Sequence, residues 1–129
     1  MALLDSLGSY LTTAGVVGGA TGWTLALGWE PPTPDQTVTL IEAGGRATDP
    51  GVRHPRFQVR VRGSAHGYSS ARTRIESVYS VLHDSAPGYE SSPSSGAIQV
   101  QALDEPILID TDELYRPIIV QRYEVLYAA

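Results

Sequence analysis

The three histidines are the side chains of this sequence best suited to bind a metal or move a proton near neutral pH. His54, His66 and His83 stand 12 and 17 residues apart, which matches none of the close histidine spacings of zinc sites. His83 is followed directly by Asp84 and Ser85, but a catalytic triad brings its members together from separate elements. The histidines therefore predict neither a metal site nor a triad.

Two other segments resemble ligand-binding motifs. Residues 110–113 (DTDE) begin like a calcium-binding loop, but Leu114 occupies the next ligand position and no glycine follows. Residues 15–22 (GVVGGATG) are rich in glycine, but they follow a predicted helix and lack both the dinucleotide-binding spacing and the lysine of a phosphate-binding loop. A solvated acidic turn and a tight turn are the simpler interpretations.

The composition excludes several further kinds of chemistry. The 129 residues contain no Cys, and the nine positions that hold Lys or Arg are all Arg. Thiolate nucleophiles, disulfides, Cys-bound zinc and lysine Schiff bases are therefore excluded. We expect a protein that is not an enzyme and that binds neither a cofactor nor a metal.

The formal net charge of −5 is distributed unevenly along the chain. Residues 1–43 hold four acids and no Arg, residues 46–74 hold seven Arg and one Asp, and residues 76–129 hold nine acids and two Arg. This acidic, basic, acidic order indicates surfaces of opposite sign that meet other surfaces. The alternative is that a GC-rich coding bias explains the choice of Arg and that its clustering is chance.

The uncharged stretch from Ser6 to Trp29 is long enough to raise the question of a membrane span. Half of it is Gly, Ser or Thr, and no Lys or Arg flanks it before Arg46. The sequence begins MALLD, without the basic start of a secretory signal. We expect neither a membrane span nor a signal peptide, and a soluble protein.

Hydrophobic periodicity predicts the elements that carry these residues. Residues 57–62 (FQVRVR) give the clearest strand pattern, because Phe57, Val59 and Val61 face one side and the polar residues face the other. Apolar residues at helical spacing predict helices over about 2–14 and 68–83. Further strands are predicted over 23–29, 37–43, 97–103, 106–109 and 117–127.

The intervening segments are predicted as turns and loops. Gly44-Gly45 closes the strand over 37–43, a polar loop follows over 46–55, and the Ser, Pro and Gly residues of 85–96 predict a flexible loop. The order of elements predicts an α+β fold of two layers, in which helices pack on one face of a mostly antiparallel sheet. The length predicts one domain over residues 1–129.

Four arginines are candidates for a binding surface. Arg60 and Arg62 share one face of the predicted strand 57–62, and Arg72 and Arg74 lie near the start of the following helix. Such a patch suits nucleic-acid phosphates, but the chain is acidic overall and offers no aromatic stacking platform near the cluster. We favour pairing with acids of a neighbouring subunit or element, because Arg is suited to interface ion pairs.

Several phrases of this sequence together resemble the tail terminator (minor capsid) proteins of long-tailed bacteriophages. The similarity covers roughly residues 35–127 and includes PDQTVTLIEAGGRATDPG, FQVRVRG, ARTRIESVYSVLHD and the closing RPIIVQRYEVLY. The resemblance implies an α+β subunit that assembles as a ring, commonly of six copies, on the last ring of the tail tube. There the ring ends tube growth and offers a surface to head-completion proteins, and DNA passes through its lumen.

The resemblance implies a virion protein that assembles in the host cytoplasm with itself, the tail tube protein and a head-completion protein. A head-to-tail ring needs two unlike complementary patches, which separated charges can supply. We therefore expect Arg60, Arg62, Arg72 and Arg74 to contact acids of the adjacent subunit or the tube. The candidate acids are Asp110, Asp112 and Glu113.

We expect the segments 44–56 and 85–96 to be candidates for regions that become ordered when a partner binds. A head-completion or connector ring protein is the alternative within virus assembly. A small ligand-binding domain and a nucleic-acid-binding module are alternatives of other classes.

Overall fold

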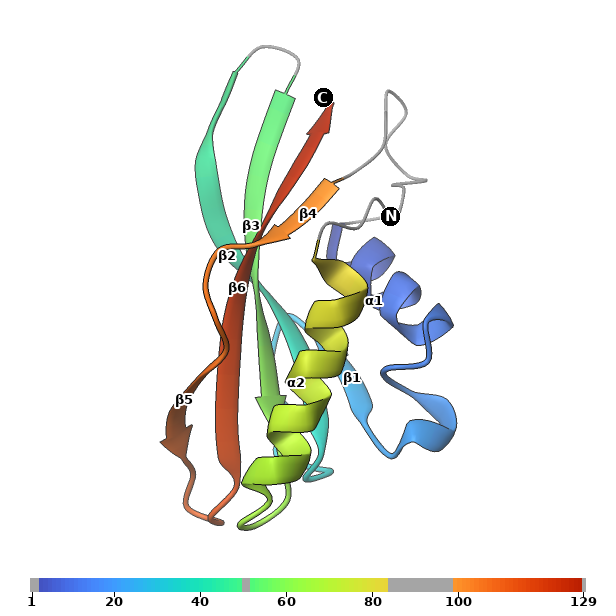
Figure 1. The fold of residues 1–129 in the computed structure, drawn as a ribbon, viewed down its shortest axis with the longest axis vertical. Coiled ribbons are helices and arrows are strands. Elements are labelled where there is room, and N and C mark those ends of the chain that lie inside the picture. The colour runs from blue at the N-terminus through green and yellow to red at the C-terminus, as the bar shows by residue number, and fades with distance from the viewer. Residues whose placement is uncertain (1–2, 50–51, 84–98, 129) are drawn as a thin grey trace.

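The computed structural model of the protein describes residues 3–49, 52–83 and 99–128. These residues form two α-helices, one 3-10 turn (η1) and six strands, joined by turns and loops (Figure 1). In chain order they are α1 (Leu3–Thr13), η1 (Gly19–Thr21), β1 (Thr24–Leu27), β2 (Thr37–Asp49), β3 (Val52–Arg62), α2 (Tyr68–Leu82), β4 (Gln99–Ala102), β5 (Ile107–Thr111) and β6 (Pro117–Ala128).

The six strands form one sheet in the order β1-β2-β3-β6-β4, and β5 also pairs with β6. β1 runs parallel to β2, and every other pair of neighbours is antiparallel. β4 pairs with residues 123–126 of β6 and β5 pairs with residues 117–120, so the two short strands lie one after the other along the same side of β6. The sheet therefore has β1 and β2 at one side and β4 and β5 at the other.

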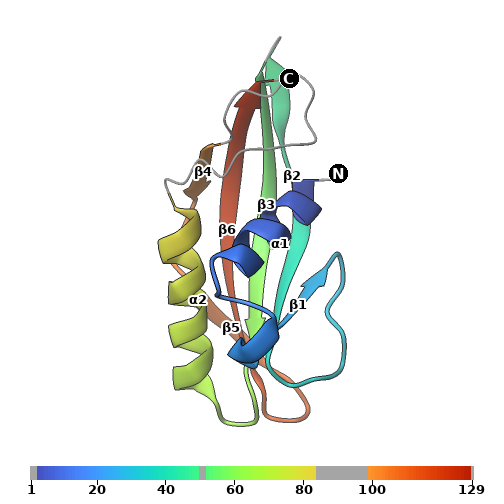
Figure 2. The same ribbon diagram turned by 90° about the vertical axis from the view of Figure 1, so that its right-hand side faces the viewer.

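Both α-helices cover the same face of the sheet (Figure 2). α1 contributes Leu4, Leu7 and Leu11 to the core, and α2 contributes one apolar residue per turn, from Ala71 to Leu82. These side chains pack on the inward residues of β2, β3 and β6 in one hydrophobic cluster. The predicted α+β fold of two layers, with helices on one face of a mostly antiparallel sheet, is confirmed.

The alternation predicted for residues 57–62 is present in β3. Phe57, Val59 and Val61 are fully buried beneath the helices. The Phe57 ring stacks on that of Tyr123 in β6, with the ring centroids 5.2 Å apart. The Tyr123 hydroxyl donates a hydrogen bond of 2.8 Å to the side-chain oxygen of Gln121, so this buried hydroxyl is satisfied. The wide apolar contact fixes β3 against β6 at the middle of the sheet.

The structure corrects the prediction that Gly44-Gly45 ends a strand and that a polar loop follows. β2 continues to Asp49 and pairs with β3, which already begins at Val52, so the segment is a long hairpin. The pairing register shifts between Glu42 and Gly45, and the two glycines have φ values of 76° and 140°. Glycine allows a bulge at which the strand bends and continues, whereas the sequence pattern suggested a stop.

The remaining predicted elements differ from the structure mainly at their ends. Helices predicted over 2–14 and 68–83 are observed as Leu3–Thr13 and Tyr68–Leu82. The segment 106–109 lies at β5, which extends to Thr111. The predicted loop over 85–96 lies outside the described residues. Neither α-helix of the described residues is long and apolar enough to cross a membrane.

Candidate assembly interface

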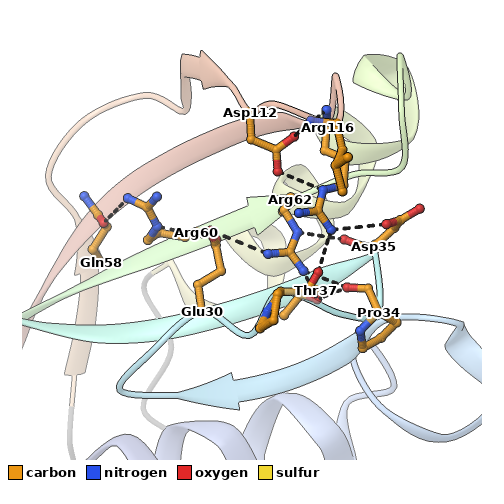
Figure 3. A network of polar contacts seen from close by, with 11 residues as sticks. Glu30, Pro34, Asp35, Thr37, Gln58, Arg60, Arg62, Asp112 and Arg116 are labelled. Atoms are coloured by element: carbon orange, nitrogen blue, oxygen red, sulfur yellow. Dashed lines mark hydrogen bonds and ion pairs between the residues drawn. The ribbon is translucent and has the colours of Figure 1, made fainter.

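The sheet face opposite the helices carries a network of charged side chains, shown in Figure 3. At its centre is Arg62, which is only 2% exposed. Its guanidinium donates to the backbone oxygens of Asp35 and Pro34, at 3.1 and 2.7 Å, and to the Thr37 hydroxyl at 3.2 Å. The segment between β1 and β2 is therefore fastened across this face by an arginine of β3.

Arg116, the residue before β6, holds the same segment from the other side. It is 6% exposed and donates a hydrogen bond of 2.7 Å to the backbone oxygen of Pro32. Its guanidinium also pairs with the carboxylates of Asp112 at 2.8 Å and Asp35 at 3.2 Å. The sequence pattern gave no reason to single out Arg116, because its partners Pro32 and Asp35 are 84 and 81 positions away.

The electrostatics of the network follow from burial and from the closeness of like charges. Burial lowers the pKa of Arg62, and the neighbouring Arg116 guanidinium lowers it further, while Glu30 acts in the opposite direction. Partial desolvation acts to raise the pKa of Asp112, but hydrogen bonds from the Arg116 backbone and side chain and from the Leu114 N–H lower it below its usual value. Within this network the three cations Arg60, Arg62 and Arg116 thus lie beside the three carboxylates Glu30, Asp35 and Asp112.

Arg60 extends the network toward the middle of the sheet. Its Nε lies 3.5 Å from a Glu30 carboxylate oxygen, and a second oxygen of Glu30 lies 3.7 Å from Arg62. The Arg60 side chain is 23% exposed, compared with 3% for the Arg62 side chain. Of the two strand arginines, Arg60 therefore has the more accessible charge.

Arg72 and Arg74 lie on α2, against the opposite face of the sheet from Arg60 and Arg62. Arg72 pairs with Glu76 at 3.3 Å and donates to the backbone oxygen of Pro106 at 3.0 Å, just before β5. Arg74 donates to the Val16 carbonyl at 3.1 Å and places its guanidinium carbon 5.4 Å from the centre of the Trp23 ring. The four candidate arginines therefore form two separate sites, and each has partners in its own chain.

The three candidate acids occupy β5 and the turn that follows it. Asp110 is exposed and accepts a hydrogen bond of 2.7 Å from the Thr111 N–H. Asp112 accepts hydrogen bonds from the backbone of Leu114 and Arg116, at 3.0 and 2.9 Å, in addition to its ion pair. Glu113 is exposed. Asp112 thus shapes the turn within the chain, whereas Asp110 and Glu113 face solvent.

Sequence reasoning missed the most unusual surface feature, a cluster of exposed aliphatic side chains on β5. Ile107, Leu108 and Ile109 are 59%, 45% and 49% exposed, and Leu114 and Tyr115 in the next turn are 58% and 62% exposed. The signal was the run of three aliphatic residues in a short predicted strand, because one of two alternating faces normally holds polar residues. Natural edge strands are usually protected by charges or by covering segments.

The histidines have structural contacts. His66 stacks on Tyr115 with the centroids 5.3 Å apart, and the His83 ring accepts a hydrogen bond of 3.2 Å from the Ala102 N–H. His54 lies 4.0 Å from the Glu124 carboxylate. Within residues 3–49, 52–83 and 99–128, no group of three or more His, Cys, Asp or Glu side chains is placed to hold a metal ion.

The family model described as bacteriophage tail terminator protein matches residues 10–128. The chain belongs to the bacteriophage tail terminator family. It is therefore a phage tail protein with a structural role in virion assembly, and the suspected resemblance is confirmed. No curated protein matches the sequence of this tail terminator at a significant level.

Proposed function

We propose that this tail terminator forms a ring, with six copies as the simplest number, that caps the tail tube, ends its growth and presents a surface for head joining. The family match over residues 10–128 carries the proposal. The exposed aliphatic strand β5 supports it, because a contiguous apolar surface on a small protein marks a site of protein–protein contact. In this role the protein acts through its surfaces and has no catalytic activity.

The proposed partners are a second copy of the chain, the tail tube protein and a head-completion protein. Phage DNA passes through the lumen of the ring without sequence-specific binding. The protein assembles in the host cytoplasm and remains at the head–tail junction of the virion. The subunits fold before they assemble, because the charged pairs described above form within each chain.

The seven charged candidates enter this proposal in two ways. Arg60, Arg72, Asp110 and Glu113 have exposed or partly exposed charges that contact a neighbouring subunit or the tube. Arg62, Arg74 and Asp112 support those contacts by holding the segments on which the surface is built. Each protomer thus contributes basic and acidic groups from different elements, as a head-to-tail contact requires.

The proposal is tested by adding the purified protein to growing tail tubes and measuring tube length and end structure by negative-stain microscopy. We expect rings at one end of the tubes and an end to further growth. The light-scattering mass of the free protein at several concentrations gives the number of copies. A protein that stays monomeric and leaves tube growth unchanged would contradict the proposal.

Separate binding assays distinguish the alternatives. Binding to DNA-filled heads in the absence of tubes would favour a head-completion ring. Retention on DNA that weakens steeply with salt would favour a nucleic-acid-binding module. A monomer at all concentrations that binds a small molecule would favour a ligand-binding domain.

A further inference from the structure

β1 and β5 lie on opposite sides of the sheet, and the same rows of paired residues run through both strands. Strand pairing links Leu108 of β5 to Leu25 of β1 through a continuous row of partners across the sheet. The row runs Leu108, Ile119, Val61, Val38 and Leu25. The adjacent row runs Ile107, Val120, Arg60, Thr39 and Ala26. Within the described residues, β1 pairs only with β2 and β5 pairs only with β6, so each has an unpaired edge.

The directions of these two edges are compatible with pairing between copies. β5, β6, β3 and β2 are successively antiparallel, and β1 is parallel to β2, so β5 and β1 run in opposite directions. When the sheet of one copy continues into the next, β5 therefore meets β1 as an antiparallel pair, which is the more stable arrangement. Because the two edges differ, the contact is head-to-tail and can close into a ring.

A groove next to β1 offers a place for a side chain of β5. The groove has a volume of about 470 Å³ and lies between α1 and β1. Leu25 and Leu27 form its apolar wall. The lining on α1 consists of Gly8 and the polar residues Asp5, Ser9, Thr12 and Thr13. Gly8 keeps this wall close, since a Cβ there would lie 2.9 Å from a methyl carbon of Leu25.

The pairing rows place Leu108 on the same face of the sheet as Leu25, which is the face that the helices cover. A strand added at the edge of β1 in this register therefore directs Leu108 toward the groove. Leu108 is 45% exposed in the isolated chain, so its burial in the groove would remove apolar surface from water. The exposed side chain of Leu108 on β5 and the groove between α1 and β1 can therefore fit together in a contact between two copies.

We propose that β5 of one copy pairs antiparallel with β1 of the next copy and inserts Leu108 into the groove between α1 and β1. This inference rests on the proposed ring and names the surface that joins its subunits. Each strand is short, four residues in β1 and five in β5, so a single contact of this kind is weak. Assembly then depends on closing the ring or on adding subunits to a tube.

The register is tested by disulfide cross-linking, for which the absence of native Cys provides a clean background. Ala26→Cys and Ile107→Cys are introduced together, because these residues lie on one pairing row. Within a chain they are separated by four strand spacings, about 19 Å, which is too far for a disulfide. Between paired copies they are opposite each other, so mild oxidation is expected to give a ladder of covalent oligomers on non-reducing gels.

The single variants serve as controls for the head-to-tail geometry. Ala26→Cys alone and Ile107→Cys alone should remain monomeric on the gel, and mixing the two should give a covalent dimer. Efficient cross-linking of either single variant with itself would show a two-fold contact and overturn the proposal. The measurement is made on the free protein at high concentration and on the protein bound to tail tubes.

The groove is tested by Leu108→Asp, which places a carboxylate against the apolar wall of Leu25 and Leu27, in a groove that Asp5 also lines. We expect at least a tenfold loss in assembly, measured by light-scattering mass and by the fraction of capped tubes. Leu126→Asp is the matched control, because Leu126 is 41% exposed on a strand and lies outside the contact. Circular dichroism verifies that both variants fold.

The outcomes separate this inference from the proposed function. Rings that form without the A26C/I107C cross-link, and that tolerate Leu108→Asp, would overturn the strand pairing and leave the tube-capping role intact. A protein that neither forms rings nor caps tubes would overturn both. Cross-linking that appears only on tubes supports the pairing and shows that assembly needs the tube.

Discussion

Arg116 connects the turn after β5 to the segment between β1 and β2 from an almost completely buried position. It bonds the Asp112 carboxylate, the Pro32 carbonyl and the Asp35 carboxylate. Arg116→Met removes these donors, so the Pro32 carbonyl and one Asp112 carboxylate oxygen lose the hydrogen bonds that Arg116 donates to them. We therefore expect the free energy of unfolding to fall by about 2–4 kcal/mol, measured by urea denaturation.

The control for this prediction is Arg122→Met, which removes an exposed ion pair. The Arg122 side chain is 56% exposed, and its Nε lies 2.9 Å from Asp104. Surface pairs of this kind contribute less than about 1 kcal/mol. Equal losses in the two variants would show that burial does not determine the role of Arg116.

The lowered pKa of Asp112 predicts how the free energy of unfolding depends on pH. Its pKa in the folded protein is lowered from 3.8, chiefly by hydrogen bonds from Arg116, which outweigh partial desolvation. A lowered pKa stabilises the fold at pH values above the unfolded pKa, and this contribution is lost as the pH falls through the folded value. We expect stability to decline below about pH 4 in the native protein.

Asp112→Asn tests this assignment, because the variant has no carboxyl group to titrate. Its free energy of unfolding should be lower than that of the native protein at pH 6, and the gap between the two should narrow as the pH falls below about 4. The free energy of unfolding is measured by urea denaturation at each pH. A gap that stays constant across this range would show that Asp112 does not contribute to the acid sensitivity.

At the scale of the element, the long β2–β3 hairpin depends on one close backbone approach. A Cβ at Gly45 would lie 2.5 Å from the His54 carbonyl oxygen, on the partner strand. Gly45→Ala is expected to lower the free energy of unfolding by about 3 kcal/mol, through both the contact and the backbone conformation. Gly44→Ala is the control, because φ is also positive there but nothing lies within 4 Å of the added atom.

The Gly44→Ala control separates the cost of the backbone conformation from the cost of the close contact with His54. Gly44→Ala should cost about 1 kcal/mol, the usual penalty for a left-handed residue other than glycine. Thermal unfolding of both variants provides the comparison. If the two alanines are equally destabilising, the close approach to His54 plays no part and only the backbone angles matter.

The elements differ in how far local sequence determines them. Alternation in 57–62 correctly predicted the buried face of β3, because side-chain period and burial are set within one strand. The continuation of β2 past Gly45 was missed, because a glycine bulge and a strand end look alike until the partner strand is known. The hydrogen bond from Arg116 to the Pro32 carbonyl joins residues 84 positions apart, and no local sequence pattern spans that distance.

At the scale of the whole molecule, the segregated charges meet within the fold as well as at its surface. The sequence analysis favoured pairing of the candidate arginines with acids of a neighbouring subunit or element, and each of the four has a partner in its own chain. Arg60 pairs with Glu30, and Arg72 pairs with Glu76. Exposure then decides which charges remain available to a neighbour, and exposure follows from tertiary contacts.

This distinction gives a prediction for assembly. Arg60→Gln and Arg72→Gln together remove two partly exposed charges and keep a polar side chain at each position. The Gln amide nitrogen stands where the Nε of Arg60 faces Glu30. If these arginines pair with Asp110 and Glu113 of a neighbour, assembly should weaken by about tenfold and become less sensitive to salt, since screening then has fewer pairs to act on. Light-scattering mass over a range of salt concentrations measures both effects.

The matched control is Arg122→Gln, which removes one exposed charge outside the candidate set. It should leave assembly unchanged, because Arg122 is not among the groups proposed to contact a neighbouring copy or the tube. Rings of the double variant that form at the native concentration with the native salt dependence would show that Arg60 and Arg72 act only within the subunit. In that case the strand edges β1 and β5 would carry the contact between copies, and apolar burial would replace charge as its main source of affinity.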